Sequence, residues 1–356
     1  MNEKDFVFES SELVDGSSSW ESPSNIALIK YWGKHRNQLP KNPSVSFTLS
    51  RSKTVTKVRY RPKINGDKKN YSFLFNSSKK KSFHEKIDKF FYRAKKYIPA
   101  IKDHFFEIES KNTFPHSSGI ASSASSMSSL ALCIMDFEKK INQKISKSFF
   151  LKKASFLARL GSGSASRSIQ GPIVSWGRSE FYNNSSQLFG TPINKISEVF
   201  KSYQDSILII DKKEKKISSS MGHDLMQSNP YAENRFFQAN KNMGMIKSIL
   251  GSGDVKNFIK IVESEALSLH AMMMTSYPSF ILMKPNTLSV IDKVIKFRNS
   301  TSVPVCFTLD AGSNVHLLYP KINFNRVQSF IDSELLKFCE SKKFINDEVG
   351  NGAKKK

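Results

Sequence analysis

Alternating apolar and polar positions predict several strands in the first half of the chain. Residues 106–109 read Phe-Glu-Ile-Glu, which is the pattern of a half-buried strand. Segments 44–49 and 54–60 alternate in the same way, so we expect them to form two paired strands. Apolar residues at helical spacing instead predict helices over 83–94, 124–135 and 148–160.

The second half of the chain mixes the same two patterns. Helical spacing recurs over 234–250 and 255–269, and short apolar runs predict strands at 206–210, 305–309 and 315–318. This mixture predicts an α+β fold of two domains with a boundary near Tyr203. We therefore expect domains at 20–203 and 204–346, between flexible tails at 1–19 and 347–356.

Composition adds a strong positive charge to this picture. The 356 residues are 39% hydrophobic, enough for two cores, and 55 Lys and Arg against 31 Asp and Glu give a net charge of +24. Such a charge attracts polyanions, so nucleic-acid binding is one possible function. The basic residues are dispersed, however, and lack zinc-finger spacing or an aromatic-basic signature. We expect no specific nucleic-acid partner and favour small anionic substrates.

The cysteines and the apolar runs indicate a cytoplasmic protein. Cys133, Cys306 and Cys339 lie far apart and form neither a metal motif nor an even disulfide framework. No apolar run approaches the roughly 20 residues that cross a bilayer, and the first 20 residues are unlike a signal peptide. The histidines show no ligand spacing either, so a structural zinc site is not expected.

The segment 115–123 reads Pro-His-Ser-Ser-Gly-Ile-Ala-Ser-Ser and separates a predicted strand from a predicted helix. The first N–H groups of a helix have no partner within it, and small residues let a phosphate approach them. The segment is therefore a candidate phosphate cradle. Taken alone, the segment favours the plainer reading of a Ser-rich loop with an N-cap, because the Gly-x4-Gly-Lys pattern is missing.

Three further segments place charged groups at the ends of apolar elements. Lys30 interrupts an apolar run, and a buried ammonium is costly unless an anion pairs with it. Arg167 closes the Gly/Ser loop 161–168, where a guanidinium can grip a carboxylate with two hydrogen bonds. Asp310 follows a predicted strand and is a candidate base, although Asp-Ala-Gly is also an ordinary turn.

These four segments, in this order, resemble the diphosphomevalonate decarboxylase family of the GHMP kinase superfamily. The resemblance runs from Ser22 to about Ile345. Its most specific parts are the run 25–34 ending in Lys-Tyr-Trp-Gly-Lys, the loop 115–123, the loop 161–168 and Thr-Leu-Asp-Ala-Gly at 308–312.

The resemblance implies a two-domain GHMP-kinase-like fold with an active-site cleft between the domains. It also implies ATP-dependent decarboxylation of (R)-mevalonate 5-diphosphate to isopentenyl diphosphate, with magnesium and a homodimeric assembly. The implied catalytic residues are Lys30, Ser123, Arg167 and Asp310. The implied ATP-binding residues are Ser110, Ser117, Ser118, Gly119, Ile120, Ala121, Ser122, Ser123 and Ser219. Those implied for the substrate are Tyr31, Trp32, Gly33, Lys34, Lys86, Ser162, Gly163, Ser164, Ala165, Ser166, Arg167 and Ser220.

Two positions depart from the family pattern. Ser313 stands where the family usually has proline, which predicts a looser loop after Asp310. His223 follows Gly222 where methionine is common. Two alternatives stay open: a related GHMP enzyme that acts on mevalonate or its monophosphate, and a basic nucleic-acid-binding protein. The metal ligands are not predicted.

Overall fold

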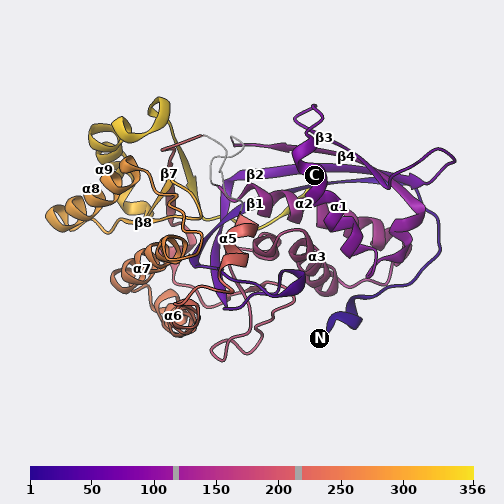
Figure 1. Ribbon diagram of the computed structural model, residues 1–356, viewed down its shortest axis with the longest axis horizontal. Coiled ribbons are helices and arrows are strands. Elements are labelled where there is room, and N and C mark those ends of the chain that lie inside the picture. The colour runs from indigo at the N-terminus through magenta and orange to yellow at the C-terminus, as the bar shows by residue number, and fades with distance from the viewer. Residues whose placement is uncertain (115–119, 213–218) are drawn as a thin grey trace.

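The computed structural model describes residues 1–114, 120–212 and 219–356 (Figure 1). The first part of the chain, together with the C-terminal strand β11, forms a seven-stranded sheet with the order β11-β1-β2-β4-β3, and β5 and β6 continue it from β2. Its strands are β1 (Gly16–Ile29), β2 (Ser44–Pro62), β3 (Tyr71–Phe75), β4 (His104–Asn112), β5 (Ile173–Trp176), β6 (Thr191–Pro192) and β11 (Lys354–Lys355).

Helices α1 (Lys81–Ala94), α2 (Ser122–Ile141) and α3 (Lys147–Gly161) pack with this sheet around one apolar core. Helix α2 lies against β1 and β2, and paired hydroxyl groups link it to them. Their oxygens are 2.6 Å apart in each of the pairs Ser22 with Ser128, Thr54 with Ser125 and Thr56 with Ser129. These links fix the start of α2 relative to the sheet.

The second part of the chain forms a four-stranded sheet with the order β10-β7-β9-β8. Its strands are β7 (Gln204–Leu208), β8 (Cys306–Thr308), β9 (Val315–Tyr319) and β10 (Phe344–Glu348). Apolar residues of α8 (Pro285–Thr301) and α9 (Phe324–Phe330) cover one face of this sheet. Apolar residues of α6 (Ala232–Ser252), α7 (Val255–Met274) and β2 share a core with the other face. That second core joins the two sheets.

Two expectations about local structure were wrong. The segments 44–49 and 54–60 are parts of one continuous strand, β2, and not two paired strands. The polar residues between them keep extended geometry because their N–H groups donate to Asp347 of β10: Ser50 and Arg51 to Oδ1 at 2.9 and 2.8 Å, and Ser52 to Oδ2 at 2.7 Å. A contact from the second sheet therefore keeps the two segments in one strand.

The two ends of the chain also differ from the expected flexible tails. Phe6 is fully buried and stacks on Phe156, and β1 already begins at Gly16. At the other end, β11 pairs with β1 in the register Trp20 with Lys355, and Figure 1 marks the C-terminus over the first sheet. Apolar burial and strand pairing order both segments.

The expected helices and strands elsewhere are confirmed, with ends shifted by a few residues. Two short helices, α4 (Glu198–Lys201) and α5 (Ser219–Leu225), lie in the connections of the second part. Cys133, Cys306 and Cys339 are buried free thiols. Within the described ranges, no helix is long and apolar enough to cross a membrane.

Candidate active site

The end of β1 and the end of β8 meet in an ion pair between Lys30 and Asp310. Lys30 Nζ lies 3.0 Å from Asp310 Oδ1, and the lysine side chain is 2% exposed against 27% for the aspartate. Burial lowers the pKa of Lys30, and the negative charges of Asp310 and Glu265 partly offset this decrease. Lys30 and Asp310, both implied to be catalytic by the family resemblance, are thus in direct contact.

A cluster from α6 and α7 holds the backbone of Lys30. The Lys30 N–H donates to Glu265 Oε2 at 2.8 Å, and the Lys30 carbonyl accepts from Asn42 Nδ2 at 2.9 Å. Glu265 is fully buried and also accepts from Arg235, and from Asn242 at 2.6 Å. The sequence analysis missed this cluster because each member fits an ordinary amphipathic helix, and no local motif marks it.

The loop after β8 is held through backbone carbonyls. The Asp310 carbonyl accepts from the N–H of Gly312 at 2.6 Å and lies 3.1 Å from Nε2 of buried His270. Thr287 Oγ1 donates to the Ser313 carbonyl at 2.7 Å. These bonds restrain the loop in which serine replaces the family proline.

Arg167 is the second buried cation of the site. It ends the short helix η4 (Gly163–Arg167), is 2% exposed, and donates from Nε to Ser46 Oγ at 2.6 Å and from Nη1 to Ser44 Oγ at 2.8 Å. Burial lowers the pKa of Arg167 to about 10, and the negative charge of Asp310 acts against this decrease. Among the described residues no carboxylate forms an ion pair with it. A buried guanidinium with only neutral partners fits an anionic ligand.

The Gly/Ser loop packs tightly against Tyr31. A Cβ atom on Gly163 would lie 2.8 Å from the Tyr31 ring and 2.9 Å from Trp176, so only glycine fits there. Ser162 Oγ lies 3.5 Å from both Ser164 Oγ and Ser123 Oγ, so these three hydroxyls face one space. Ala165 and Ser166 are buried and shape the loop.

Tyr31, Trp32 and Gly33 surround His223 of α5. The His223 ring centroid lies 4.2 Å from that of Tyr31 and 4.6 Å from that of Trp32, and the Gly33 N–H donates to Nδ1 at 3.0 Å. Burial lowers the pKa of His223 to about 3, and the charges of Lys34 and Arg167 add to the shift. The Tyr31 hydroxyl oxygen is buried without a hydrogen-bond partner in the described chain. His223 therefore supports the residues that resemble the substrate-binding run.

Lys34 lies among further cations. Its Nζ is 3.7 Å from Asp224 Oδ1, and burial lowers its pKa, with the charges of Arg93 and Lys89 adding to the effect and Asp224 opposing it. Arg93 donates to the Leu160 carbonyl at 2.6 Å, directly before the Gly/Ser loop. Lys86, the expected residue of α1, is exposed about two turns earlier in the helix. The structure thus points to Arg93 as the α1 cation that lies near Lys34.

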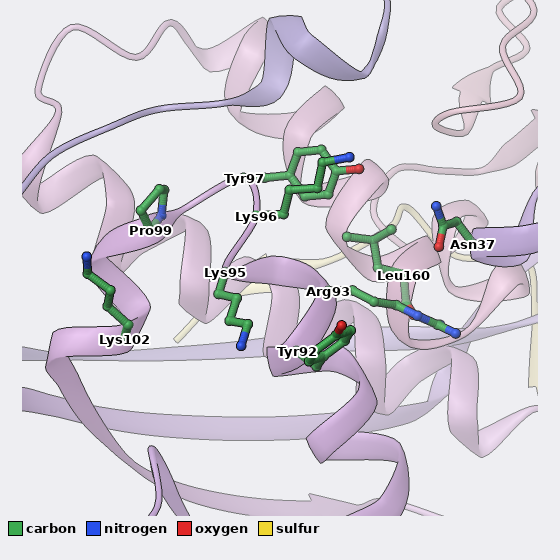
Figure 2. A pocket seen from close by; sticks show the side chains of 9 residues that line it. All are labelled: Asn37, Tyr92, Arg93, Lys95, Lys96, Tyr97, Pro99, Lys102 and Leu160. Carbon is green, nitrogen blue, oxygen red and sulfur yellow. The ribbon is translucent and has the colours of Figure 1, made fainter.

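A basic pocket of about 600 Å³ borders this region, and in Figure 2 the Arg93 side chain extends past Leu160 toward Asn37. Its lining includes four cationic side chains, of one arginine and three lysines, and two tyrosine rings. Its lining residues are Asn37, Tyr92, Arg93, Lys95, Lys96, Tyr97, Pro99, Lys102 and Leu160.

Within the described residues, no side chain caps the start of α2. Ala121 is the N-cap residue, with φ +36°, and its methyl group cannot accept a hydrogen bond. Ser122 and Ser123 open the helix, and Ile120 is anchored by Ser24 Oγ, which donates to its carbonyl at 2.5 Å. The geometry fits an anion at this helix start. Ser110 lies inside the sheet instead, with its hydroxyl 3.0 Å from that of Thr56.

Some expected residues cannot be placed. Ser117, Ser118 and Gly119 lie outside the described residues, as do the side chains of Ser219 and Ser220. The described site therefore joins Lys30, Arg167 and Asp310 with the loops at 31–34 and 162–164.

Comparisons with known proteins find family matches for both the N-terminal and the C-terminal part of the chain. Residues 22–187 match the diphosphomevalonate decarboxylase-like N-terminal domain, and residues 206–355 match the mevalonate 5-diphosphate decarboxylase C-terminal domain. The chain belongs to the diphosphomevalonate decarboxylase family. This membership agrees with the resemblance seen in the sequence.

Individual relatives cover most of the chain. The diphosphomevalonate decarboxylase of Candida albicans is 26% identical over 336 residues, which are 88% of this chain and 87% of that protein. The crystal structure of mevalonate diphosphate decarboxylase from Staphylococcus aureus is 27% identical, with a TM-score of 0.82 over 96% of this chain and 98% of that chain. MDDEF in complex with MVAPP, AMPPCP and magnesium is 25% identical, also with a TM-score of 0.82, over 96% and 99%. These likenesses confirm the α+β, two-domain GHMP-like fold.

The described part of the chain offers no cage of protein carboxylates for magnesium. Within the described ranges, no group of three His, Cys, Asp or Glu side chains could hold a metal ion. Mg²⁺ at phosphate sites is usually bound by the phosphates, by water and by one or two protein oxygens. The Ser123 hydroxyl at the start of α2 fits that smaller contribution.

Proposed function

We propose that this chain converts (R)-mevalonate 5-diphosphate and ATP to isopentenyl diphosphate, ADP, phosphate and carbon dioxide. The observation that carries the proposal is the position of Arg167. It is a buried cation without a carboxylate partner in the described chain, and it lies within electrostatic reach of the Lys30–Asp310 pair. A base beside a carboxylate-binding cation is what a reaction coupling hydroxyl phosphorylation to loss of carbon dioxide requires.

In this proposal Asp310 addresses the C3 hydroxyl of the substrate. Its carboxylate accepts the hydroxyl proton while the oxygen attacks the γ-phosphorus, and Lys30 holds the carboxylate in place at 3.0 Å. Glu265 in turn fixes the peptide of Lys30, so the attacking geometry rests on elements from both sheets.

The ATP phosphates lie at the start of α2 in this proposal. The positive end of the helix dipole there and the hydroxyls of Ser122 and Ser123 stabilise negative charge. Magnesium, when bound, neutralises charge on the β- and γ-phosphates. The expected roles of Ser117, Ser118, Gly119, Ser219 and Ser220 stay predictions, and so does that of Ser110.

Phosphorylation turns the C3 oxygen into a good leaving group. As the C3–O bond breaks, positive charge develops at C3, and the electrons of the bond to the carboxylate carbon form the new double bond while carbon dioxide leaves. Arg167 orients that carboxylate. The substrate diphosphate meets Lys34, Tyr31, Ser162 and Ser164, where the unpartnered Tyr31 hydroxyl can donate.

The decisive assay measures ADP, phosphate and carbon dioxide released by the purified protein with mevalonate 5-diphosphate. We expect the three products in equal amounts, and release of ADP without carbon dioxide would contradict the proposal. Mevalonate and its monophosphate serve as competing substrates, because the cations around Lys34 read the terminal phosphates. Faster turnover of the monophosphate would favour the alternative GHMP enzyme.

The remaining expectations are also open to direct measurement. Light scattering of the purified protein checks the predicted homodimer, and fractionation of the source cells checks the cytoplasmic location. Salt-dependent DNA binding at physiological ionic strength, unaffected by mevalonate 5-diphosphate, would revive the nucleic-acid alternative.

A further inference from the structure

Helix α7 binds the backbones of both members of the Lys30–Asp310 pair. Glu265 of α7 accepts the Lys30 N–H at 2.8 Å, and Nε2 of His270 lies 3.1 Å from the Asp310 carbonyl oxygen. A carbonyl oxygen can only accept, so Nε2 of His270 is the donor of that bond. Lys30 follows β1 of the first sheet and Asp310 follows β8 of the second, and α7 packs against both strands (Figure 1). The helix is therefore a support that the two residues share.

The part of α7 between these two contacts is a continuous helix. Glu265 and His270 are five positions apart, which is about 7.5 Å along a helix axis, and neither glycine nor proline lies between them. Both side chains belong to residues that are at most 1% exposed. A fixed separation on α7 thus gives the backbones of Lys30 and Asp310 a fixed separation as well.

The Lys30 peptide depends on side chains because it lies beyond the strand pairing. The last paired residue of β1 is Ile29, opposite Val45. Beyond it, the Lys30 N–H donates to Glu265, and the Lys30 carbonyl accepts from Asn42. Removal of the Glu265 carboxylate would therefore leave a buried N–H without its acceptor.

Arg235 of α6 balances the charge of this buried carboxylate. Its guanidinium donates to both oxygens of Glu265, to Oε1 at 3.1 Å, and Asn242 donates to Oε1 at 2.6 Å. A buried ion pair often adds little to stability, and two apolar side chains of similar volume can replace it without loss. The Lys30 N–H thus explains a carboxylate at this position better than packing does.

Apolar packing joins the neighbours of both residues to the same helix. Trp32 follows Lys30 by two positions, and Ala311 follows Asp310 directly. Both belong to one buried apolar cluster, whose members on α7 are Leu269, Met272 and Met273. The loops after β1 and β8 are therefore held to α7 by side-chain packing as well as by hydrogen bonds.

We propose that Glu265 and His270 are positioning residues, which set the distance between Lys30 and Asp310 through the helix that they share. Lys30 Nζ lies 3.0 Å from Asp310 Oδ1, and this contact requires both backbones to keep their places. A displacement of about 1 Å near reacting groups can lower a rate about 100-fold, so small shifts of either backbone matter. The role of the two residues rests on the proposed function of Asp310.

Replacing the Arg235–Glu265 pair by apolar residues separates positioning from stability. Glu265→Leu alone leaves Arg235 buried without its anion, so we expect a lower melting temperature together with a lower kcat. The double variant Arg235→Met with Glu265→Leu should recover most of the melting temperature. Its kcat should stay about 10- to 100-fold below that of the wild type, with KM for ATP unchanged, because the Lys30 N–H still lacks its acceptor.

The matched control is the Lys153–Glu138 pair, which is fully buried and binds the Tyr97 carbonyl instead of a site residue. Lys153→Met with Glu138→Leu should also recover its melting temperature, but it should keep the wild-type kcat. A wild-type kcat in Arg235→Met with Glu265→Leu would overturn the proposal. So would equal losses of kcat in the two double variants.

Two substitutions at His270 test the other contact of the helix. His270→Gln can place an amide N–H where Nε2 donates, whereas His270→Leu has no donor. We expect His270→Leu to lower kcat about tenfold with KM for ATP unchanged, and His270→Gln to keep most of the kcat. A wild-type kcat in His270→Leu would contradict the proposal. Equal losses in both variants would also contradict it, because the loss would then follow from the missing ring.

Crystal structures of Arg235→Met with Glu265→Leu and of His270→Leu test the positioning without any turnover. In each variant, the distance from Lys30 Nζ to Asp310 Oδ1 should lengthen by about 1 Å from its value of 3.0 Å. An unchanged distance in both variants would overturn the proposal. Wild-type protein that releases no carbon dioxide, while the variants show the longer distance, would instead disprove the decarboxylase reaction and leave the role of α7 established.

Discussion

Two lysine–carboxylate ion pairs in this molecule differ in how completely they are shielded from solvent; we call the fully buried one the closed pair and the other the open pair. Lys153 of α3 and Glu138 of α2 lie 2.6 Å apart, and both side chains are 0% exposed. Lys30 and Asp310 lie 3.0 Å apart, but Asp310 is 27% exposed and Arg167 adds a cation without a carboxylate partner in the described chain.

The difference separates a structural pair from a reactive one. The Lys153–Glu138 pair balances its charge within the first core, and the Tyr97 carbonyl also accepts from Lys153 at 3.3 Å. The Lys30–Asp310 pair with Arg167 carries an excess positive charge at an open edge. Burial with balanced charge stabilises a fold, whereas burial with unbalanced charge prepares a site for an anion.

The largest expected effect comes from the open pair. Asp310→Asn keeps the shape but cannot accept the hydroxyl proton, so kcat for carbon dioxide release should fall about 10²- to 10⁴-fold. ATP binding, measured by calorimetry, should be almost unchanged, because the phosphates are proposed to lie at α2. Turnover near that of the wild type would remove Asp310 from its role.

Breaking the closed pair should affect stability and not chemistry. Lys153→Met leaves Glu138 buried without its cation and should lower the free energy of unfolding by about 3–5 kcal/mol. The double variant Lys153→Met with Glu138→Leu should recover most of this loss in denaturant titrations. A kcat change in the folded double variant would show that the pair is not merely structural.

Arg167→Lys tests the unbalanced cation at constant charge. Lysine cannot donate to Ser44 and Ser46 and still grip a carboxylate with a planar fork, so kcat/KM should fall about 10- to 100-fold. Steady-state kinetics with mevalonate 5-diphosphate measures this loss. An unchanged kcat/KM would place the substrate carboxylate elsewhere.

His223 gives the smallest effect and a defined pH dependence. Its folded pKa of about 3 lies below the ordinary value of 6.5, so the unfolded chain binds a proton first as the pH falls. The stabilisation is complete above about pH 6.5 and is lost progressively toward pH 3. Between pH 7 and pH 5 this residue should contribute about 2 kcal/mol of the loss in unfolding free energy.

The matched variant is His223→Met, which carries the residue common in the family. Denaturant titrations at both pH values should show a smaller pH dependence in this variant. An identical pH dependence would mean that His223 does not stay neutral in the folded protein.

Local patterns in the sequence were enough to predict the residues that carry charge to the site. Lys30 interrupts an apolar run, and Arg167 and Asp310 each follow an apolar element, so burial and exposure could be inferred from neighbours in the chain. The structure brings these three together as expected.

The partners that position these residues could not be predicted in the same way. Glu265 holds the Lys30 peptide from 235 positions away, and Asp347 orders the polar stretch of β2 from 295 to 297 positions away. Such contacts depend on how the two sheets pack. A single helix or strand pattern contains no information about that packing.

The last strand has a consequence for dividing the chain. Strand β11 lies on the first sheet, although the strand that precedes it in the chain, β10, belongs to the second. If the chain were cut near residue 204, β11 would be part of the C-terminal fragment, whereas its partner strand β1 would be in the N-terminal fragment. The edge of β1 would then be left exposed. Complementation from two fragments should therefore require residues 349–356 to be moved or duplicated, while a circular permutant that joins the original ends could keep every pairing.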